Sequence, residues 1–369
     1  MRPSRTRRAS AVALVLLAAA CGTPAATGGE AATEAATEPA TGPATAAPAS
    51  AGRTVYPLTI DNCGTRVTFR RPPQRVLILN GTSVGEVESF LLLGLERSIL
   101  ANAQSYGVSD DPSMTARIKA LPTGGLTMNK NFDVPAEQVL KLKPDLVVST
   151  WSGGFDPARG FATREQLAAA GITSLVNPVN CAMGKPEATE QEKRAYRNQS
   201  INSSLEFLSL LGRVFDVQRK AFDLIGRLRA RVESVRARVA ALPPRKVLIA
   251  YPGMAMMNAN GLPAVMTGGI YDDVIRAAGG VNAFAGQTAD MTRTLNREQL
   301  ATAQVDVLVV GLFTPEEKGE EAAAKLFAAY PHWAAARSRS YTVVSDGVYL
   351  GPLNAWAVEK ISKVVHPGG

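Results

Sequence analysis

Apolar residues along this chain gather into two pairs of similar segments. The segment RVLILN at 75–80 is matched by KVLIAY at 246–251, and EQVLKLKPDLVV at 137–148 is matched by EQLATAQVDVLVV at 298–310. Each of the longer segments predicts a short helix, a tight turn and a continuous apolar strand. Strands that are apolar throughout are typical of parallel sheets covered by helices on both faces. The repeat therefore predicts an α/β fold with two similar lobes in succession.

A helical period separates the two halves of the repeat. Apolar residues recur at steps of three and four at Phe222, Ile225, Leu228, Val232, Val235, Val239 and Leu242. Pro243 and Pro244 end the pattern, because proline cannot continue a helix. A helix of this length, about 36 Å, spans a small domain. We expect one long helix at 216–242 to join a lobe at 54–215 to a lobe at 243–369, with a cleft between the lobes and only a modest hinge.

The beginning of the chain differs from the rest. Four arginines precede the apolar run Ala11–Ala20, which is too short to cross a bilayer and is typical of a secretory signal peptide at 1–20. Cys21 follows three alanines and resembles the lipidated cysteine of a bacterial lipobox; plain signal-peptidase cleavage beside an incidental cysteine is the alternative. Residues 21–53 are rich in Ala, Thr and Pro and predict a disordered tether. This pattern predicts a lipid anchor at the extracellular face of a bacterial cell membrane.

Charge and cysteine content narrow the classes of partner. The formal charge of +8 falls to +4 without the four arginines of residues 1–20, because those residues contain no acid. This mild basic bias comes without a basic stripe interleaved with aromatics, so nucleic acid is not an expected partner. The basic residues at 227–238 are interpreted as the solvated face of a helix. In an oxidising compartment a disulfide between Cys63 and Cys181 is expected, with two buried free thiols as the alternative.

The sequence lacks the motifs and residues on which several main classes of enzyme depend. Neither G-x-x-x-x-G-K-[ST] nor G-x-G-x-x-G occurs, so no phosphate-binding loop is predicted. The two histidines, His332 and His366, provide no general base for a hydrolase and cannot build a multi-histidine metal site. We therefore expect a protein that is not an enzyme and holds no metal or cofactor of its own. A metal would reach it only inside a larger organic ligand.

Several segments together resemble one family of binding proteins. Besides the lipobox and the tether, these are YPLTIDNCGTRVTFRRPPQRVLILN at 56–80, KPDLVVS at 143–149, AAGGVNAFAG at 277–286 and YLGPLNAWAVEKISKVVHP at 349–367. Over about residues 54–367 the chain resembles the substrate-binding lipoproteins of iron–siderophore and cobalamin ABC importers.

The resemblance implies two Rossmann-like lobes joined by a single long helix, with the ligand held between them. It also implies a protein, expected to be a monomer, that captures an iron–siderophore complex and delivers it to an ABC permease. Cobalamin or haem is the alternative ligand. A surface lipoprotein that binds or senses without import is the alternative role.

Candidate ligand contacts follow the predicted strands, because ligands of open α/β sheets bind outside the carboxyl ends of the strands. Aromatic rings with polar tips suit a large, flat, partly polar ligand, and arginine suits an anionic group. In a strand, Met254 and Met256 would share one face. A core position remains the competing interpretation for the aromatic and methionine candidates, and a surface position for Arg293. The candidates are Asn80, Thr82, Ser83, Tyr106, Trp151, Tyr251, Met256, Arg293 and Tyr349.

The resemblance further implies one exposed acidic residue on each lobe for docking to the permease. Glu165 lies in the matching region of the first lobe. In the second lobe, Glu316 and Glu317 are expected on the first turn of a helix. Acids at a helix N-terminus also interact favourably with the helix dipole, which is the structural alternative for Glu316.

Overall fold

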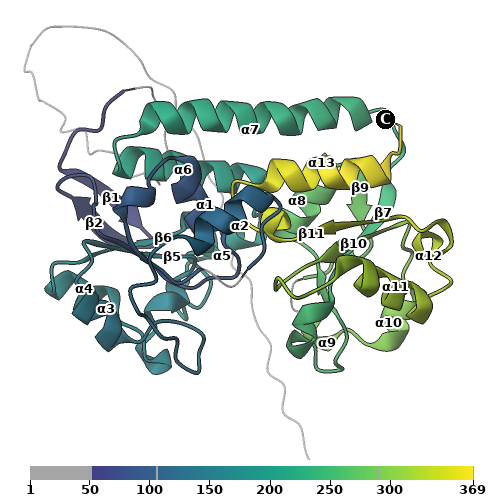
Figure 1. The fold of residues 1–369 in the computed structure, drawn as a ribbon, viewed down its shortest axis with the longest axis horizontal. Coiled ribbons are helices and arrows are strands. Elements are labelled where there is room, and N and C mark those ends of the chain that lie inside the picture. The colour runs from purple at the N-terminus through teal and green to yellow at the C-terminus, as the bar shows by residue number, and fades with distance from the viewer. Residues whose placement is uncertain (1–51, 105–106, 289–290, 369) are drawn as a thin grey trace, which may run out of the picture. The chain divides into compact units, whose positions relative to one another are not determined.

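The computed structural model describes residues 52–104, 107–288 and 291–368. The predicted signal peptide, Cys21, nearly all of the predicted tether and Tyr106 lie outside these ranges. No helix within them is long and apolar enough to span a membrane. Two α/β lobes follow one another along the chain, as the repeat predicts (Figure 1).

The first lobe contains a parallel sheet of four strands in the order β4-β3-β5-β6. Its strands are β3 (Val76–Ile78), β4 (Ile99–Asn102), β5 (Leu146–Ser149) and β6 (Thr173–Val176), preceded by the antiparallel hairpin of β1 (Leu58–Asn62) and β2 (Thr65–Phe69). Its helices are α1 (Gly85–Leu92), α2 (Pro112–Lys119), α3 (Ala136–Leu142), α4 (Arg164–Ala169), α5 (Glu190–Arg197) and α6 (Ile201–Val214). Every residue of β3 and β5 is buried, as expected for parallel strands covered on both faces.

The second lobe contains a five-stranded sheet with the path β11-β10-β7-β8, and β9 also pairs with β7. Its strands are β7 (Arg245–Tyr251), β8 (Ala264–Met266), β9 (Gly280–Asn282), β10 (Val307–Gly311) and β11 (Tyr341–Val344). Its helices are α8 (Gly269–Ala277), α9 (Met291–Thr294), α10 (Arg297–Thr302), α11 (Gly319–Ala329), α12 (Ala334–Ser338) and α13 (Asn354–Val365). Only β8 runs antiparallel to its neighbour in this sheet, a feature that the sequence pattern does not predict.

In both long repeat segments an aspartate stands eight places after the first Glu, and it has the same task in both lobes. Asp145, at the start of β5, accepts hydrogen bonds from the backbone N–H groups of Gln74 and Arg75 at 2.8 and 2.9 Å. Asp306, at the start of β10, accepts one from the backbone N–H of Lys246 at 2.8 Å. Each carboxylate therefore aligns the beginning of one central strand with the beginning of its neighbour.

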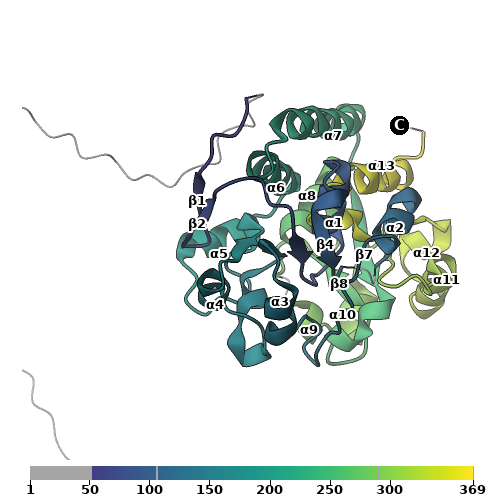
Figure 2. The same ribbon diagram turned by 60° about the vertical axis from the view of Figure 1, so that its left-hand side comes forward.

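Helix α7 (Gln218–Val239) joins the lobes and is 22 residues, about 33 Å, long. Figures 1 and 2 show it alongside α6 and α13. Its buried face is formed by Ala221, Leu224, Ile225, Leu228, Val232, Val235 and Val239. The prediction was wrong for Phe222, which is 51% exposed, and for Leu242, which is 36% exposed and lies beyond the helix. Phe222 lies about 100° around the helix from Ala221, so it falls outside the apolar stripe.

A charged contact fixes α7 to the last helix. The guanidinium of Arg231 donates to both carboxylate oxygens of Glu359 on α13 at 2.8 and 2.7 Å. The same guanidinium lies 3.6 Å from the centre of the Trp356 ring. Because both partners belong to α13, the second lobe is held to the middle of the connecting helix.

One apolar core extends into both lobes. It contains Val76 and Leu146 from the first sheet, Val247 and Val307 from the second, and the buried face of α7. Two further cores, each within one lobe, cover the opposite faces of the two sheets. The lobes are therefore joined by packed side chains as well as by the chain itself.

The hairpin at the start of the fold is tied to the first lobe by the disulfide Cys63–Cys181. Cys63 and Gly64 both have positive φ, at 59° and 79°, as a two-residue type I′ turn requires. Cys181 follows β6, and 118 positions separate the two cysteines.

Replacing Cys63 and Cys181 with alanine should lower the free energy of unfolding by roughly 2–5 kcal/mol, because the unfolded chain regains the freedom of a long loop. Urea denaturation of the two proteins measures the difference. Alkylation of both thiols in the untreated native protein would contradict the disulfide itself.

Candidate ligand site

The lobes meet around a cavity of about 20 Å³, large enough for about one water molecule. It is lined by Thr82, Ser83, Val84, Gly107 and Val108 of the first lobe and by Tyr251, Leu312, Phe313, Ser345, Asp346 and Tyr349 of the second. These residues follow the carboxyl ends of β3, β4, β7, β10 and β11, where ligands of open α/β sheets bind. The cavity therefore forms the floor between the two lobes, and it brings together four predicted contacts, Thr82, Ser83, Tyr251 and Tyr349.

The floor is closed by buried tyrosines. Tyr251 is 1% exposed, and its hydroxyl donates a hydrogen bond to the carbonyl of Ser345. The Tyr349 ring packs edge-on against the rings of Tyr251 and Tyr271, with distances of 5.6 and 5.5 Å between ring centres. Burial raises the pKa of Tyr251 and of Tyr271 well above the ordinary value, so both phenols stay neutral. Tyr251 thus supports the floor with a hydroxyl that is already engaged.

The floor includes a sequence that resembles a hydrolase motif. Residues 81–85 read GTSVG, which fits G-x-S-x-G, and they connect a strand to a helix. However, Ser83 does not have the positive φ of a nucleophile elbow, and its hydroxyl accepts the backbone N–H of Gly85 at 3.2 Å. His332 contacts the carbonyl of Ala301 and His366 that of Gly279, so neither is available to Ser83 as a base.

Asn80 anchors the loop that forms the rim of the first lobe. Its side-chain N–H donates to the carbonyl of Phe132 at 2.6 Å, and its backbone N–H donates to Asp133 at 3.0 Å. The side-chain oxygen of Asn80 is buried and has no partner among the described residues. Phe132 itself is 77% exposed. The rim of the first lobe therefore contains a hydrogen-bond acceptor that no described residue uses, the side-chain oxygen of Asn80, and an exposed aromatic ring, that of Phe132.

Trp151 stands on the same rim and is paired with a cation that the sequence analysis missed. The guanidinium of Arg159 lies 4.9 Å from the centre of the Trp151 ring, and its Nη2 donates to the carbonyl of Asn131 at 3.3 Å. A Cβ on Gly153 or Gly184 would overlap the ring, so both positions need glycine for this packing. Arg159 is eight residues beyond Trp151 in the same loop, and only its place after β5 could have drawn attention to it.

The rim of the second lobe carries methionines. Met256 is 77% exposed and Met257 is 47% exposed, whereas Met254 is buried. The expectation of a strand here was wrong, because Pro252–Met257 forms a 3₁₀ helix, η5. Proline has no N–H with which to continue the ladder of β7.

Exposed large apolar side chains gather on the two rims. In the part of the chain that the structure describes, four of seven such residues are Met128, Phe132, Met256 and Met257. Met128 and Phe132 lie in the loop between α2 and α3, which Asn80 ties to the end of β3, whereas Met256 and Met257 follow β7 of the second lobe. Arg293, on α9, is exposed and does not line the cavity.

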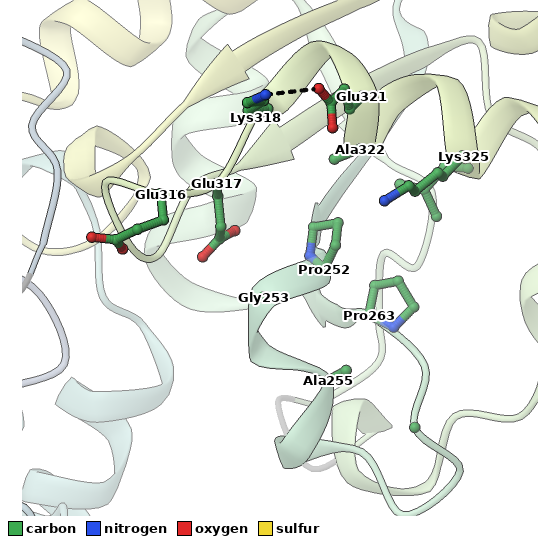
Figure 3. A pocket seen from close by; sticks show the side chains of 12 residues that line it. Pro252, Gly253, Ala255, Pro263, Glu316, Glu317, Lys318, Glu321, Ala322 and Lys325 are labelled. Atoms are coloured by element: carbon green, nitrogen blue, oxygen red, sulfur yellow. Dashed lines mark ion pairs between the residues drawn. The ribbon is translucent and has the colours of Figure 1, made fainter.

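A larger hollow of about 530 Å³ lies within the second lobe, between η5 and the start of α11 (Figure 3). Glu316 and Glu317 border it, but the prediction that they lie on the first turn of a helix was wrong, because α11 begins at Gly319. The carboxylate of Glu317 accepts the backbone N–H groups of Phe313 and Thr314 at 3.2 and 2.9 Å. These bonds close a turn before the helix, and they leave Glu316 as the exposed acid.

Glu165 lies on the first turn of α4 and is exposed. Thr163 and Gln166 form a capping box that fixes the start of this helix. Within the described ranges, no group of three or more His, Cys, Asp or Glu residues is placed to hold a metal ion.

The fold and its inter-lobe site define a two-lobed binding protein. Residues 82–339 match the family model described as periplasmic binding protein, and the chain belongs to this family. No curated protein sequence matches the chain.

Solved structures share the fold. A structure named as an ABC-type Fe3+-hydroxamate transport system from Saccharomonospora viridis is 24% identical, with a TM-score of 0.60 over 84% of this chain and 99% of that one. A periplasmic binding protein from Veillonella parvula is 15% identical, with a TM-score of 0.64 over 84% and 97%. A periplasmic heme binding protein from Pseudomonas aeruginosa is 22% identical, with a TM-score of 0.57 over 80% and 94%.

Burial raises the pKa of Asp133, beneath the first rim, to about 6 from 3.8. Its contribution to stability is therefore complete below pH 3.8 and is lost as the pH rises towards 6. Between pH 4 and 6 the free energy of unfolding of the native protein should fall by up to roughly 3 kcal/mol relative to Asp133→Asn. Denaturant titrations across this range test the difference, and parallel curves for the two proteins would contradict it.

Proposed function

We propose that this protein captures a ferric siderophore of the hydroxamate type between its lobes and delivers it to an ABC permease. The observation that carries the proposal is the pair of apolar rims, with Met128 and Phe132 exposed on one lobe and Met256 and Met257 exposed on the other. Exposed apolar patches mark binding sites, and a ligand enclosed by both rims would remove them from water. Methionine adapts to irregular ligand shapes.

The chemistry of the site favours a ligand that coordinates its own iron. Haem iron is held by His, Cys, Met or Tyr side chains of the protein. Here both histidines bond carbonyls elsewhere in the second lobe, and Cys63 and Cys181 form a disulfide. The tyrosine hydroxyls in the cavity lining are engaged as well, that of Tyr251 with the Ser345 carbonyl and that of Tyr349 with the Met254 sulfur. A siderophore needs no protein ligand to its metal. Haem remains the alternative, because Met256 presents an exposed thioether and several structures of the same fold are named as haem-binding.

Charge favours a hydroxamate complex over a catecholate complex. Ferric tris-hydroxamates are neutral or weakly charged, whereas ferric tris-catecholates are multiply negative. Arg159 supplies one partly buried cation, but Glu316 and Glu317 place negative charge at the edge of the opposite lobe. A multiply negative ligand would meet too few cations to offset its desolvation.

Delivery requires attachment to the membrane and contact with the permease. Lipid on Cys21 would hold the protein at the extracellular face of the membrane, with the residues before the fold as a tether. Glu165 and Glu316 are exposed acids that would meet cationic residues of the permease, whereas Glu317 is occupied by its own turn.

Titration with ferric hydroxamates should quench tryptophan fluorescence with a dissociation constant below about 1 μM, because Trp151 stands on the rim. Ferric catecholates, haem and cobalamin complete the panel. Quenching by none of these ligands would contradict import of iron, and saturation by haem or cobalamin alone would select the alternative ligand.

The rims can be tested within the same titration. The double change Phe132→Ala and Met256→Ala should weaken binding at least about 30-fold, since each of the two lost apolar contacts is worth about 1–3 kcal/mol. Phe222→Ala is the matched control, because Phe222 is exposed on α7, away from both rims. Equal losses in the rim and control variants would show that the rims do not bind the ligand.

Substitution of the proposed docking residues should reduce uptake without reducing ligand affinity. Changing Glu165 and Glu316 to alanine should leave ligand affinity and melting temperature nearly unchanged while uptake by cells falls steeply, because a lost charge-assisted contact costs about 2–5 kcal/mol in a complex. Glu298→Ala is the control, since Glu298 occupies the first turn of α10 in the same Arg-Glu-Gln-Leu-Ala sequence as Glu165. Undiminished uptake in the double variant would refute this docking site.

A further inference from the structure

A carboxylate of the first lobe reaches into the second beside the floor of the site. Asp110, in the loop after β4, accepts the backbone N–H groups of Ser345 and Gly347 at 2.9 and 2.8 Å. Its own backbone N–H donates to Asp346 at 2.9 Å, and the Lys360 ammonium lies 2.6 Å from its second carboxylate oxygen. Four contacts thus join this single residue to positions 235–250 places further along the chain.

The fit around Asp110 is close. Its side chain is fully buried, and a Cβ added to Gly347 would lie only 2.7 Å from its carboxylate oxygen. Ser345 and Asp346 also line the inter-lobe cavity, as does Val108 from the Asp110 loop. The lobes therefore cannot move apart at the floor of the site without breaking the Asp110 contacts.

A third carboxyl group lies against this junction. Glu88, on α1, is 0% exposed and accepts the Ser109 hydroxyl at 2.6 Å. Among the described residues, Lys360 on α13 is the cation that contacts the cluster of Glu88, Asp110 and Asp346, through its ion pair with Asp110. The neutral phenol of Tyr251 faces the same cluster from β7. With Glu88, Asp110 and Asp346 all ionised, two buried negative charges would have no cation, which is costly in a protein interior.

Burial, followed by the neighbouring charge of Asp346, raises the pKa of Glu88 well above its ordinary value. The pKa of Asp346 is also raised, mainly by burial. Because its pKa is raised in the folded state, Glu88 contributes to stability at low pH, and this contribution is lost as the pH rises through the pKa of the folded protein. Ionised Glu88 then repels Asp346 and Asp110.

We propose that Asp110 latches the two lobes together at the floor of the ligand site, and that a proton held on Glu88 keeps this latch closed. Loss of the proton weakens the link between Asp110 and residues 345–347, so the lobes loosen in alkaline solution and stay closed in acid. This pH-dependent contact is formed by residues of the two lobes alone and does not require a bound ligand.

Amide hydrogen exchange at Ser345 and Gly347 tests the latch directly, using the ligand-free full chain with Cys21→Ala to prevent lipidation. After correction for intrinsic exchange, protection of both amides in the native protein should fall at least about tenfold as pH rises from 6 to 9. Glu88→Gln, which is neutral and nearly isosteric, should retain protection throughout. Asp110→Asn should lose it at every pH, because an amide whose one oxygen accepts both N–H groups must turn its NH2 group, itself a donor, towards the Lys360 ammonium.

The Ile201 amide provides an internal control. It donates to Asp273 across the same two lobes at 2.9 Å, through a carboxylate outside the cluster of Glu88, Asp110 and Asp346, and its protection should not differ between the native protein and Glu88→Gln. An identical pH dependence of Ser345 and Gly347 in these two proteins would overturn the role of the proton. Native-like protection in Asp110→Asn would overturn the latch, and Lys360→Met, which leaves Asp110 without its cation, repeats the test should Asp110→Asn fail to fold.

Discussion

The apolar core shared by the two lobes is the constraint on which the rest of this structure depends. Val76 and Val247, central strand residues of the two lobes, belong to one packed cluster with the inner face of α7. Because protein interiors are close-packed, such a cluster resists the independent movement of its parts. The carboxyl edges of the two sheets are consequently held face to face before any ligand arrives, and recognition is left to the loops beyond those edges.

Much of this arrangement could be predicted from the sequence, because it depends on local periodicity. The alternation of helix and apolar strand, the eight-residue spacing to Asp145 and Asp306, and the long helix are all properties of short windows. The errors occurred where the apolar spacing was followed without regard to the angle around the helix or to a proline at the end of a strand. Phe222 fits the three-and-four spacing but lies at the margin of the stripe, and Pro252 turns the methionine segment into a 3₁₀ helix.

The site was less accessible to prediction than the fold. Thr82 and Tyr349 could be found because they follow strands, and strand ends are visible in the sequence. Arg159 lies within a loop whose course depends on bonds to Asn129 and Asn131, and no periodic pattern marks it. Likewise, Asp110 resembles any surface aspartate before a helix, and only the folded chain brings it to Ser345 more than two hundred residues away.

The packing of the Trp151 ring against Gly153 and Gly184 gives the two walls of the site different mechanical characters. An indole ring held in this way has little rotational freedom left to lose when a ligand stacks on it, so this wall is preorganised. The thioether of Met256 opposite can choose among many rotamers. One wall can thus select the shape of a ligand while the other accommodates variation in its periphery.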